Sequence, residues 1–208
     1  MYLDSTRVIR ALKWSDKMIS ALGLSDPASP YTPVSIEEIQ DFVATTTGWS
    51  ITKEEVVYAQ GQYIRGRIHR LPGKVVKIHV RRDQETDWKR LVAAKELFEV
   101  LIAEEGDMCP YGDEILDSLV LEGHIGIISP EIGNGNHCQT ELISEIAAME
   151  TLYPLGMRAR DIGQLHPNGP LTIGKLSLKY GIPEGTVSTL VNPRYLKTIE
   201  RAKNLHSD

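Results

Sequence analysis

Residues 86–104 read TDWKRLVAAKELFEVLIAE. Apolar side chains recur along this segment at helical spacing and form a broad stripe, which contains Leu91, Ala94, Leu97 or Phe98, Leu101 and Ile102. The pattern predicts a helix that begins at Thr86 or Asp87 and ends near Glu104. Because its apolar stripe is broad, we expect this helix to lie at the centre of the fold.

The segment before this helix alternates with a period of two. Apolar and polar side chains alternate in two runs, residues 63–69 (YIRGRIH) and residues 76–80 (VKIHV). A Pro-Gly turn lies between the runs, within residues 71–74. The pattern predicts a β-hairpin with one apolar and one polar face.

Further elements are predicted on both sides of the hairpin and the central helix. An amphipathic helix containing Val8, Leu12 and Ile19 is expected to stop at Gly23, and a capping box formed by Ser35 and Glu38 opens a second helix. After the central helix we predict a short acidic helix at 113–121, an apolar strand at 125–128, a Gly- and Asn-rich loop at 132–137, and helices at 140–152 and 157–165.

Length and composition are those of an ordinary globular chain. The sequence has 208 residues, 41% hydrophobic and 25% charged, which excludes disordered, collagen-like and low-complexity classes. Two cysteines, Cys109 and Cys138, cannot form a disulfide framework, and no apolar run reaches the length of a membrane span. We therefore expect a cytoplasmic protein without membrane contact.

Charge is distributed unevenly along the chain. Residues 1–170 carry 17 basic and 25 acidic side chains, a net charge of −8, whereas residues 171–208 carry 6 and 3, a net charge of +3. The C-terminal segment is therefore the part of the chain best suited to contact a polyanion.

The central helix and the elements around it resemble the ImmA/IrrE family of zinc metallopeptidases. The family's helix reads approximately R-F-T-x-A-H-E-x-G-H, and residues 90–99 of this chain read RLVAAKELFE. The resemblance covers roughly residues 50–192. It implies an α+β fold in which a small antiparallel sheet packs on a degenerate zincin-type motif helix, flanked by further helices. It also implies a pseudopeptidase core at 49–169, between an N-terminal helical extension at 1–48 and a C-terminal segment at 170–208.

The two metal-binding histidines of that motif are absent from this chain. Histidines at positions i and i+4 of a helix share one face and together hold a zinc ion. Lys95 and Glu99 stand at these positions, and an ammonium group has no lone pair with which to bind a metal. The resemblance aligns Glu96 with the general base and Glu141 with the third zinc ligand. We therefore expect no catalytic residue, no metal and no cofactor at Lys95, Glu96, Glu99 and Glu141.

The sequence leaves two interpretations of Lys95 open. Its ammonium group could neutralise Glu99 one turn on, together with Glu96 or Glu141, and hold the old site closed as a salt-bridged plug. Alternatively, Lys95 and Glu99 form an exposed helical ion pair worth about 0.3–0.5 kcal/mol. Sequence spacing does not decide between the two, because it does not place the neighbouring elements.

Other candidate sites give weaker signals. Two groups of zinc-ligand residue types lack the spacing of a known site: His137 with Cys138, His124 and Cys109, and His69 with His79. The loop IGNGN at residues 132–136 lacks the Lys and the following Ser or Thr of a phosphate-binding loop. We interpret these segments as a polar hairpin face and a turn.

Residues 171–191, LTIGKLSLKYGIPEGTVSTLV, resemble a helix-turn-helix. Small Ser177, turn-forming Gly181 and apolar Val187 have the offsets that let two short helices cross closely. The space between the helices is expected to be filled by Leu176, Ile182 and Leu190.

Binding of DNA by this segment is one of two open interpretations. The side chains that would contact base edges or phosphates are Thr186, Ser188 and Thr189, helped by Lys175, Lys179, Arg194 and Lys197. The second helix, however, has no Arg, Lys, Asn or Gln before Asn192, and these side chains discriminate base edges best. ImmA/IrrE-like proteins often end with a similar segment that packs on the domain, so packing or protein contact is the other interpretation.

The function expected from the resemblance is binding rather than catalysis. We expect a non-catalytic ImmA/IrrE-like protein, a regulator of the phage or mobile-element type, that binds a protein partner, and contact with DNA through its C-terminal segment stays open. One alternative is a working metallopeptidase whose metal is held by Glu96, Glu99 and Glu141, carboxylates that favour a harder ion than zinc. The other is a helix-turn-helix transcriptional regulator.

Overall fold

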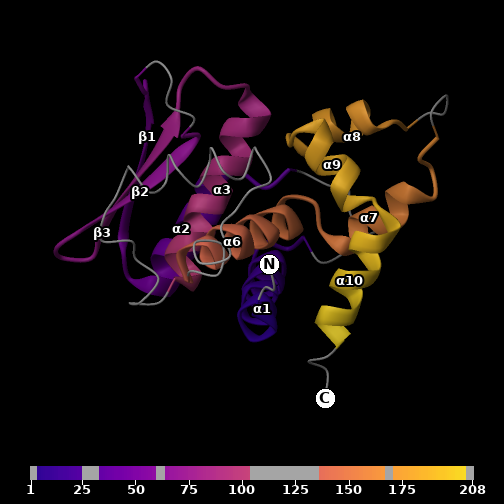
Figure 1. The fold of residues 1–208 in the computed structure, drawn as a ribbon, viewed down its shortest axis with the longest axis horizontal. Coiled ribbons are helices and arrows are strands. Elements are labelled where there is room, and N and C mark those ends of the chain that lie inside the picture. The colour runs from indigo at the N-terminus through magenta and orange to yellow at the C-terminus, as the bar shows by residue number, and fades with distance from the viewer. Residues whose placement is uncertain (1–3, 25–32, 60–63, 104–135, 167–170, 205–208) are drawn as a thin grey trace.

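The computed structural model describes residues 4–24, 33–59, 64–103, 136–166 and 171–204. Within these ranges the fold is α+β, with eight helices and one three-stranded sheet (Figure 1). The elements are α1 (Ser5–Ala21), α2 (Ile36–Thr47), β1 (Ser50–Val56), β2 (Gly66–Leu71), β3 (Val75–Arg81), α3 (Thr86–Ile102), α6 (Asn136–Leu152), α7 (Leu155–Ile162), α8 (Ile173–Tyr180), α9 (Glu184–Leu190) and α10 (Pro193–Asn204).

The sheet is mixed rather than antiparallel. Its strand order is β1-β3-β2, with β2 antiparallel to β3 in the predicted hairpin and β1 parallel to β3. Gly73 and Lys74 form the hairpin turn with positive φ angles of 80° and 59°. The sequence gives no clear alternation for β1, because Ile51 is its only buried side chain and the remainder of SITKEEV is polar or partly exposed. The prediction of an antiparallel sheet is therefore wrong for the edge strand β1, which runs parallel to β3.

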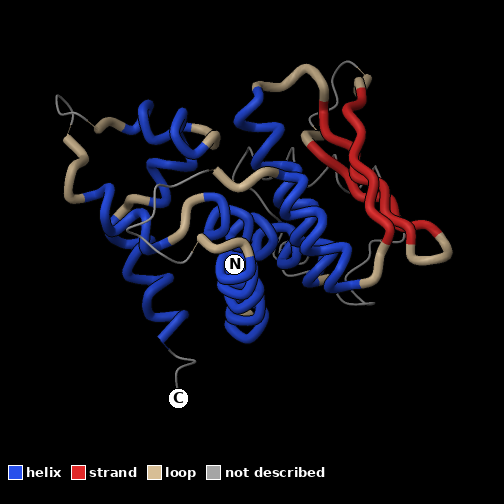
Figure 2. The backbone as a smooth tube through the Cα atoms, turned by 180° about the vertical axis from the view of Figure 1, so that it is seen from behind, coloured by secondary structure: helices blue, strands red, loops and turns tan. Residues whose placement is uncertain are grey.

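Helix α3 is the central element, as its broad apolar stripe predicts. It packs on the sheet through β2 and β3, and on α6, α2 and α1 through its other sides. Figure 2 shows the sheet at one end of the molecule and the helices beyond it. Buried side chains such as Leu91, Leu97 and Phe98 join Val76 and Ile78 of β3 in one hydrophobic core. Because nearly every side of α3 is covered, even two of its glutamates, described below, are buried.

Side-chain caps mark the start of both N-terminal helices. Asp4 caps α1 by accepting hydrogen bonds from the backbone N–H groups of Thr6 and Arg7. At α2, Ser35 and Glu38 form the predicted capping box, with hydrogen bonds of 3.1 and 2.7 Å. These caps satisfy N–H groups that have no partner inside a helix.

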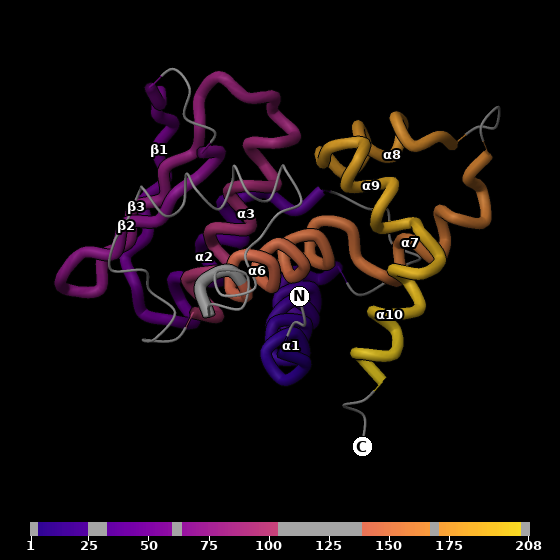
Figure 3. The backbone as a smooth tube through the Cα atoms, in the orientation of Figure 1, coloured from indigo at the N-terminus to yellow at the C-terminus, as the bar shows by residue number. Residues whose placement is uncertain are grey.

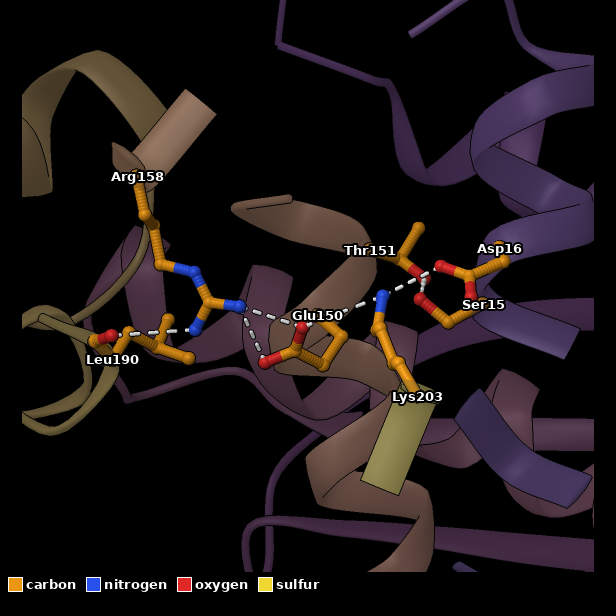
Figure 4. Close-up of polar contacts among 7 residues, drawn as sticks. All are labelled: Ser15, Asp16, Glu150, Thr151, Arg158, Leu190 and Lys203. Atoms are coloured by element: carbon orange, nitrogen blue, oxygen red, sulfur yellow. Dashed lines mark hydrogen bonds and ion pairs between the residues drawn. The ribbon is translucent and has the colours of Figure 1, made fainter. Parts of the chain in front are cut away.

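The N-terminal and C-terminal helices both pack against α6. In Figure 3, α6 runs from α3 toward α7 and the C-terminal helices. Polar side chains from α1, α6, α7 and α10, together with the backbone carbonyl of Leu190 in α9, meet around Glu150 of α6 (Figure 4). The hydrophobic core likewise contains Ala11, Ile78 and Val187, which belong to the three predicted segments 1–48, 49–169 and 170–208. Those boundaries remain predictions, and the core is continuous across them.

Several sequence expectations lie outside the described residues, namely the elements at 113–121 and 125–128, most of the loop at 132–137, and Cys109 and His124. Helix α6 begins at Asn136 rather than Thr140, and α7 covers Leu155–Ile162 rather than 157–165. Among the described helices, none is both long enough and apolar enough to cross a membrane.

Candidate functional site

Helices α3 and α6 bring together four charged side chains. The ammonium Nζ of Lys95 lies 3.0 Å from Oε1 of Glu96 and 3.7 Å from Oε2 of Glu99, and it is also in contact with the carboxylate of Glu141. We call these four residues the Lys95 cluster. One basic group thus lies among three acidic groups that come from two helices.

The local geometry of α3 explains three of these positions. Lys95 and Glu99 are one helical turn apart and therefore share a face, while Glu96 follows Lys95 directly. Glu141 stands near the start of α6, which packs along α3. The side chains are 16% exposed for Lys95, 3% for Glu96, 10% for Glu99 and 31% for Glu141. The Lys95–Glu99 pair is therefore part of a largely buried cluster and not an exposed helical ion pair.

Strand β2 closes the cluster from the side of the sheet. A Cβ atom on Gly66 would lie 2.3 Å from Cγ1 of Val92 and 2.8 Å from Oε1 of Glu96, so only a glycine fits here. Near the end of β2, Arg70 donates a hydrogen bond of 3.1 Å from Nη2 to the backbone carbonyl of Glu99. Strand β2 therefore packs directly against the turn of α3 that carries Glu96 and Glu99.

Charge and burial shift the pKa values of the Lys95 cluster. Burial by itself would lower the pKa of Lys95, but the carboxylates of Glu141, Glu96 and Glu99 outweigh it and raise that pKa well above its ordinary value. Burial raises the pKa of Glu96, and burial together with Glu141 and Glu96 raises the pKa of Glu99 well above the ordinary range. Lys95 therefore stays a cation, while the surplus of acidic groups favours a proton on Glu99.

A zinc ion does not fit the residues of this cluster. Zinc sites usually hold four ligands in a tetrahedron and include imidazoles or thiolates, whereas the Lys95 cluster offers only carboxylates, and all three are in contact with an ammonium group whose pKa is raised. Within the described ranges, no group of three or more His, Cys, Asp or Glu side chains is arranged to hold a metal ion. The alternative site of Glu96, Glu99 and Glu141 would require a hard metal ion to displace Lys95.

The other zinc-ligand residue types form no described metal site. The rings of His69 and His79 lie on the sheet with their centroids 4.5 Å apart, as a pair without a third ligand among the described residues. Burial, Arg67 and His79 lower the pKa of His69, which is typical of a histidine in positive surroundings. The side chains of His137 and Cys138, like those of His124 and Cys109, lie outside the described part of the chain.

The C-terminal segment forms the predicted helix-turn-helix. Gly181 ends α8 in the left-handed conformation, with φ 61°, and the hydroxyl of Ser177 donates a 2.7 Å hydrogen bond to the carbonyl of Ile182. Leu176, Ile182 and Leu190, which are expected to fill the space between the helices, are completely buried, and so is Val187. Sequence offsets alone therefore predict this unit correctly.

Two of the residues expected to contact DNA make contacts within the fold instead. Thr186 is only 9% exposed and borders a pocket that α6 also lines, so little of its side chain is accessible to a base edge. Lys179 forms an ion pair of 3.0 Å with the buried Asp161 of α7. The remaining candidates are exposed at the surface: Lys175, Ser188, Thr189, Arg194 and Lys197.

Sequence reasoning missed the buried polar groups of α6 and α7. Arg158 and Glu150 are wholly buried and paired, and Asp161 accepts hydrogen bonds from Tyr153, Tyr180 and Lys179. Burial would raise the pKa of Asp161, but the hydrogen bonds from Tyr180 and Lys179 outweigh it and lower that pKa. Nothing in the local pattern separates these charges from ordinary surface charges, because their partners lie on other helices.

Comparisons with known proteins bear on the fold. No family model matches the sequence, and no curated protein matches it significantly. A solved structure described as a Mycobacterium tuberculosis transcriptional regulator is similar to 89% of this chain, with a TM-score of 0.50 and 14% sequence identity. The match covers 48% of that regulator, so this chain spans about half of its length. At this level of identity the similarity establishes a shared fold.

Proposed function

We propose that this protein is a catalytically inactive ImmA/IrrE-like protein that acts as a regulator by binding a protein partner. The observation that carries the proposal is the position of Lys95. Its ammonium group lies among Glu96, Glu99 and Glu141, where the family would hold a dication. The positive charge needed to keep these carboxylates together is thus supplied by a side chain of the chain itself.

The geometry around Lys95 supports a structural role for the cluster. Acidic groups this close repel each other when they are ionised, and the repulsion is strong where water is largely excluded. Lys95 relieves it from the centre, while Gly66 and Arg70 hold β2 against the same turn of α3. A peptidase needs an open metal position and an activated water at this place, whereas here a cation that cannot act as a Lewis acid fills it.

Metal analysis of the purified chain tests the proposal. The wild type is incubated with equimolar zinc or manganese, desalted and measured by mass spectrometry of the metal, with Glu99→Ala as the comparison. We expect no stoichiometric metal in either protein. Stoichiometric metal in the wild type that is lost in Glu99→Ala would overturn the inactive-protein proposal and support the carboxylate metallopeptidase.

Contact with DNA through the C-terminal unit is a second candidate function. It is favoured by the exposure of Lys175, Arg194 and Lys197 around the helix-turn-helix, and the solved structure with the same fold is described as a transcriptional regulator. Thr186 and Lys179 are unsuitable for testing it, because replacing them disturbs packing and an ion pair.

A salt titration of DNA binding tests this second function. The triple variant Lys175→Ala, Arg194→Ala and Lys197→Ala should weaken binding to a duplex and flatten its salt dependence, since each phosphate contact adds to the salt slope. A matched control replaces three exposed lysines at the opposite end of the fold: Lys53, Lys74 and Lys77. Equal binding by the wild type and the triple variant would show that these side chains do not contact DNA.

A further inference from the structure

A pocket of about 340 Å³ lies between the helix-turn-helix unit and the central helices. Its walls come from Trp88 at the start of α3, from Met149 and aliphatic side chains of α6, and from Gly185 and Thr189 of α9. We call it the α6–α9 pocket. Its volume is within the range of small-molecule sites in proteins, and its lining is predominantly apolar, as is usual for such sites.

One acidic group stands in this apolar lining. Glu145 of α6 borders the pocket, and burial raises its pKa because the carboxylate is partly removed from water. The charges that act on it within the described chain are those of Lys95, Glu141 and Arg65, and none of them donates a hydrogen bond to it. Lys95 is already in contact with three other carboxylates. Among the described residues that line the pocket, Glu145 is therefore the one charged side chain, and the nearby Lys95 and Arg65 offset part of its charge.

The aromatic wall favours a cation as well. The guanidinium of Arg65 lies over the ring of Trp88, with its carbon 3.5 Å from the ring centroid. Cations are attracted to the face of an indole ring, and the attraction increases when water is excluded. Because Arg65 already covers one face of this ring, an amine in the pocket would meet the carboxylate of Glu145 and the remaining surface of Trp88, and the hydroxyl groups of Thr186 and Thr189 add polar contacts at the α9 side.

We propose that the α6–α9 pocket binds a small organic cation, an amine with an apolar aromatic or aliphatic body. Such a ligand would contact α3, α6 and α9 at once. It would therefore stabilise the position of the helix-turn-helix unit against the central helices, and its concentration would control how that unit is presented to a partner. This inference does not depend on whether the protein is catalytically inactive.

Nuclear magnetic resonance of the methionine methyl groups tests the pocket directly. Met149 lines it, and its signal is assigned with a Met149→Leu variant. The probes are phenethylamine and n-hexylamine, with 2-phenylethanol and 3-phenylpropanoate as the neutral and anionic analogues of the first. We expect saturable shifts of the Met149 signal with the amines, and at least about tenfold weaker binding of the alcohol and the acid. No saturable shift with either amine, or equal affinity for the alcohol, would overturn the proposal.

Two variants and a matched control locate the binding. Glu145→Gln should remove the preference for the amine over the alcohol and retain the apolar binding. Gly185→Leu should abolish binding of both, because a Cβ atom at Gly185 meets nothing within 4 Å and a leucine there can fill the pocket. The control is Gly156→Leu on α7, where a Cβ atom also meets nothing within 4 Å but which does not line the pocket. Binding that survives Gly185→Leu, or is lost equally in Gly156→Leu, would contradict the assignment.

Discussion

Arg158 of α7 donates hydrogen bonds of 2.7 and 2.6 Å from Nη2 to the two carboxylate oxygens of Glu150 on α6, and neither side chain is exposed (Figure 4). A second nitrogen of Arg158 donates a 3.3 Å hydrogen bond to the carbonyl of Leu190 at the end of α9. Lys203 of α10 lies 3.9 Å from Glu150 and 2.6 Å from Asp16 of α1. A single buried carboxylate thus links the two terminal parts of the chain to α6.

Replacing Arg158 with methionine should destabilise the protein by about 3–5 kcal/mol, because Glu150 would be left buried without its strongest partner. Urea unfolding followed by circular dichroism measures this loss. The double variant Arg158→Met and Glu150→Met removes both charges and should be more stable than Arg158→Met alone. If the losses of stability in Arg158→Met and in Glu150→Met simply add in the double variant, the two side chains are not energetically coupled.

Replacing Gly66 with alanine should destabilise the protein by about 1–3 kcal/mol. The added Cβ atom would overlap Val92 at 2.3 Å and crowd Glu96, so β2 or α3 would have to move. Thermal unfolding of Gly66→Ala is compared with that of Gly156→Ala, where the Cβ atom meets nothing within 4 Å and a small gain is expected. Equal melting temperatures for the two variants would show that β2 does not pack closely against the Lys95 cluster.

The dependence of stability on pH should change in Glu99→Gln. The folded-state pKa of Glu99 lies well above its ordinary value of 4.5, so the folded chain binds the proton more tightly than the unfolded chain. Wild-type stability should therefore fall as pH rises from 4.5 toward the folded-state pKa, by at most about 1.4 kcal/mol per pH unit from this group. The glutamine variant cannot ionise and should lack this loss.

Urea unfolding of wild type and Glu99→Gln at a series of pH values measures the difference. Glu54→Gln, at an exposed position of β1, serves as the control for loss of a carboxylate. The stability of Glu99→Gln relative to wild type should increase with pH above 4.5. Parallel pH profiles for the two proteins would contradict a buried, proton-binding Glu99.

Local patterns predicted the elements whose partners lie near in sequence. The helical stripe of α3, the alternation of β2 and β3, the Ser35–Glu38 capping box and the glycine turn at Gly181 all depend on residues within about one or two helical turns. The grouping of Lys95, Glu96 and Glu99 also follows from helical spacing alone. The position of Glu141 beside them was expected only from the family resemblance, because it depends on how α6 packs on α3.

Features that depend on distant partners were not predictable from the sequence. Strand β1 owes its place to parallel pairing with β3, and its own sequence is mostly polar. Thr186 stands at a helix-turn-helix position where a DNA contact is expected, but in the folded chain it is largely buried and borders the α6–α9 pocket. Gly66 reads as an ordinary strand residue until the distance to α3 is known. Tertiary packing decides all three.

Zinc binding by the double variant Lys95→His and Glu99→His tests the central claim most directly. If Lys95 and Glu99 stand where two imidazoles would bind a metal and Glu141 faces them, this variant should bind one zinc ion per chain, because two imidazoles one turn apart and a carboxylate form a zinc site. Adding Glu141→Ala should weaken that binding. Isothermal titration with zinc, after circular dichroism has verified folding, gives the result. A folded double variant that binds no more zinc than the wild type would contradict the account.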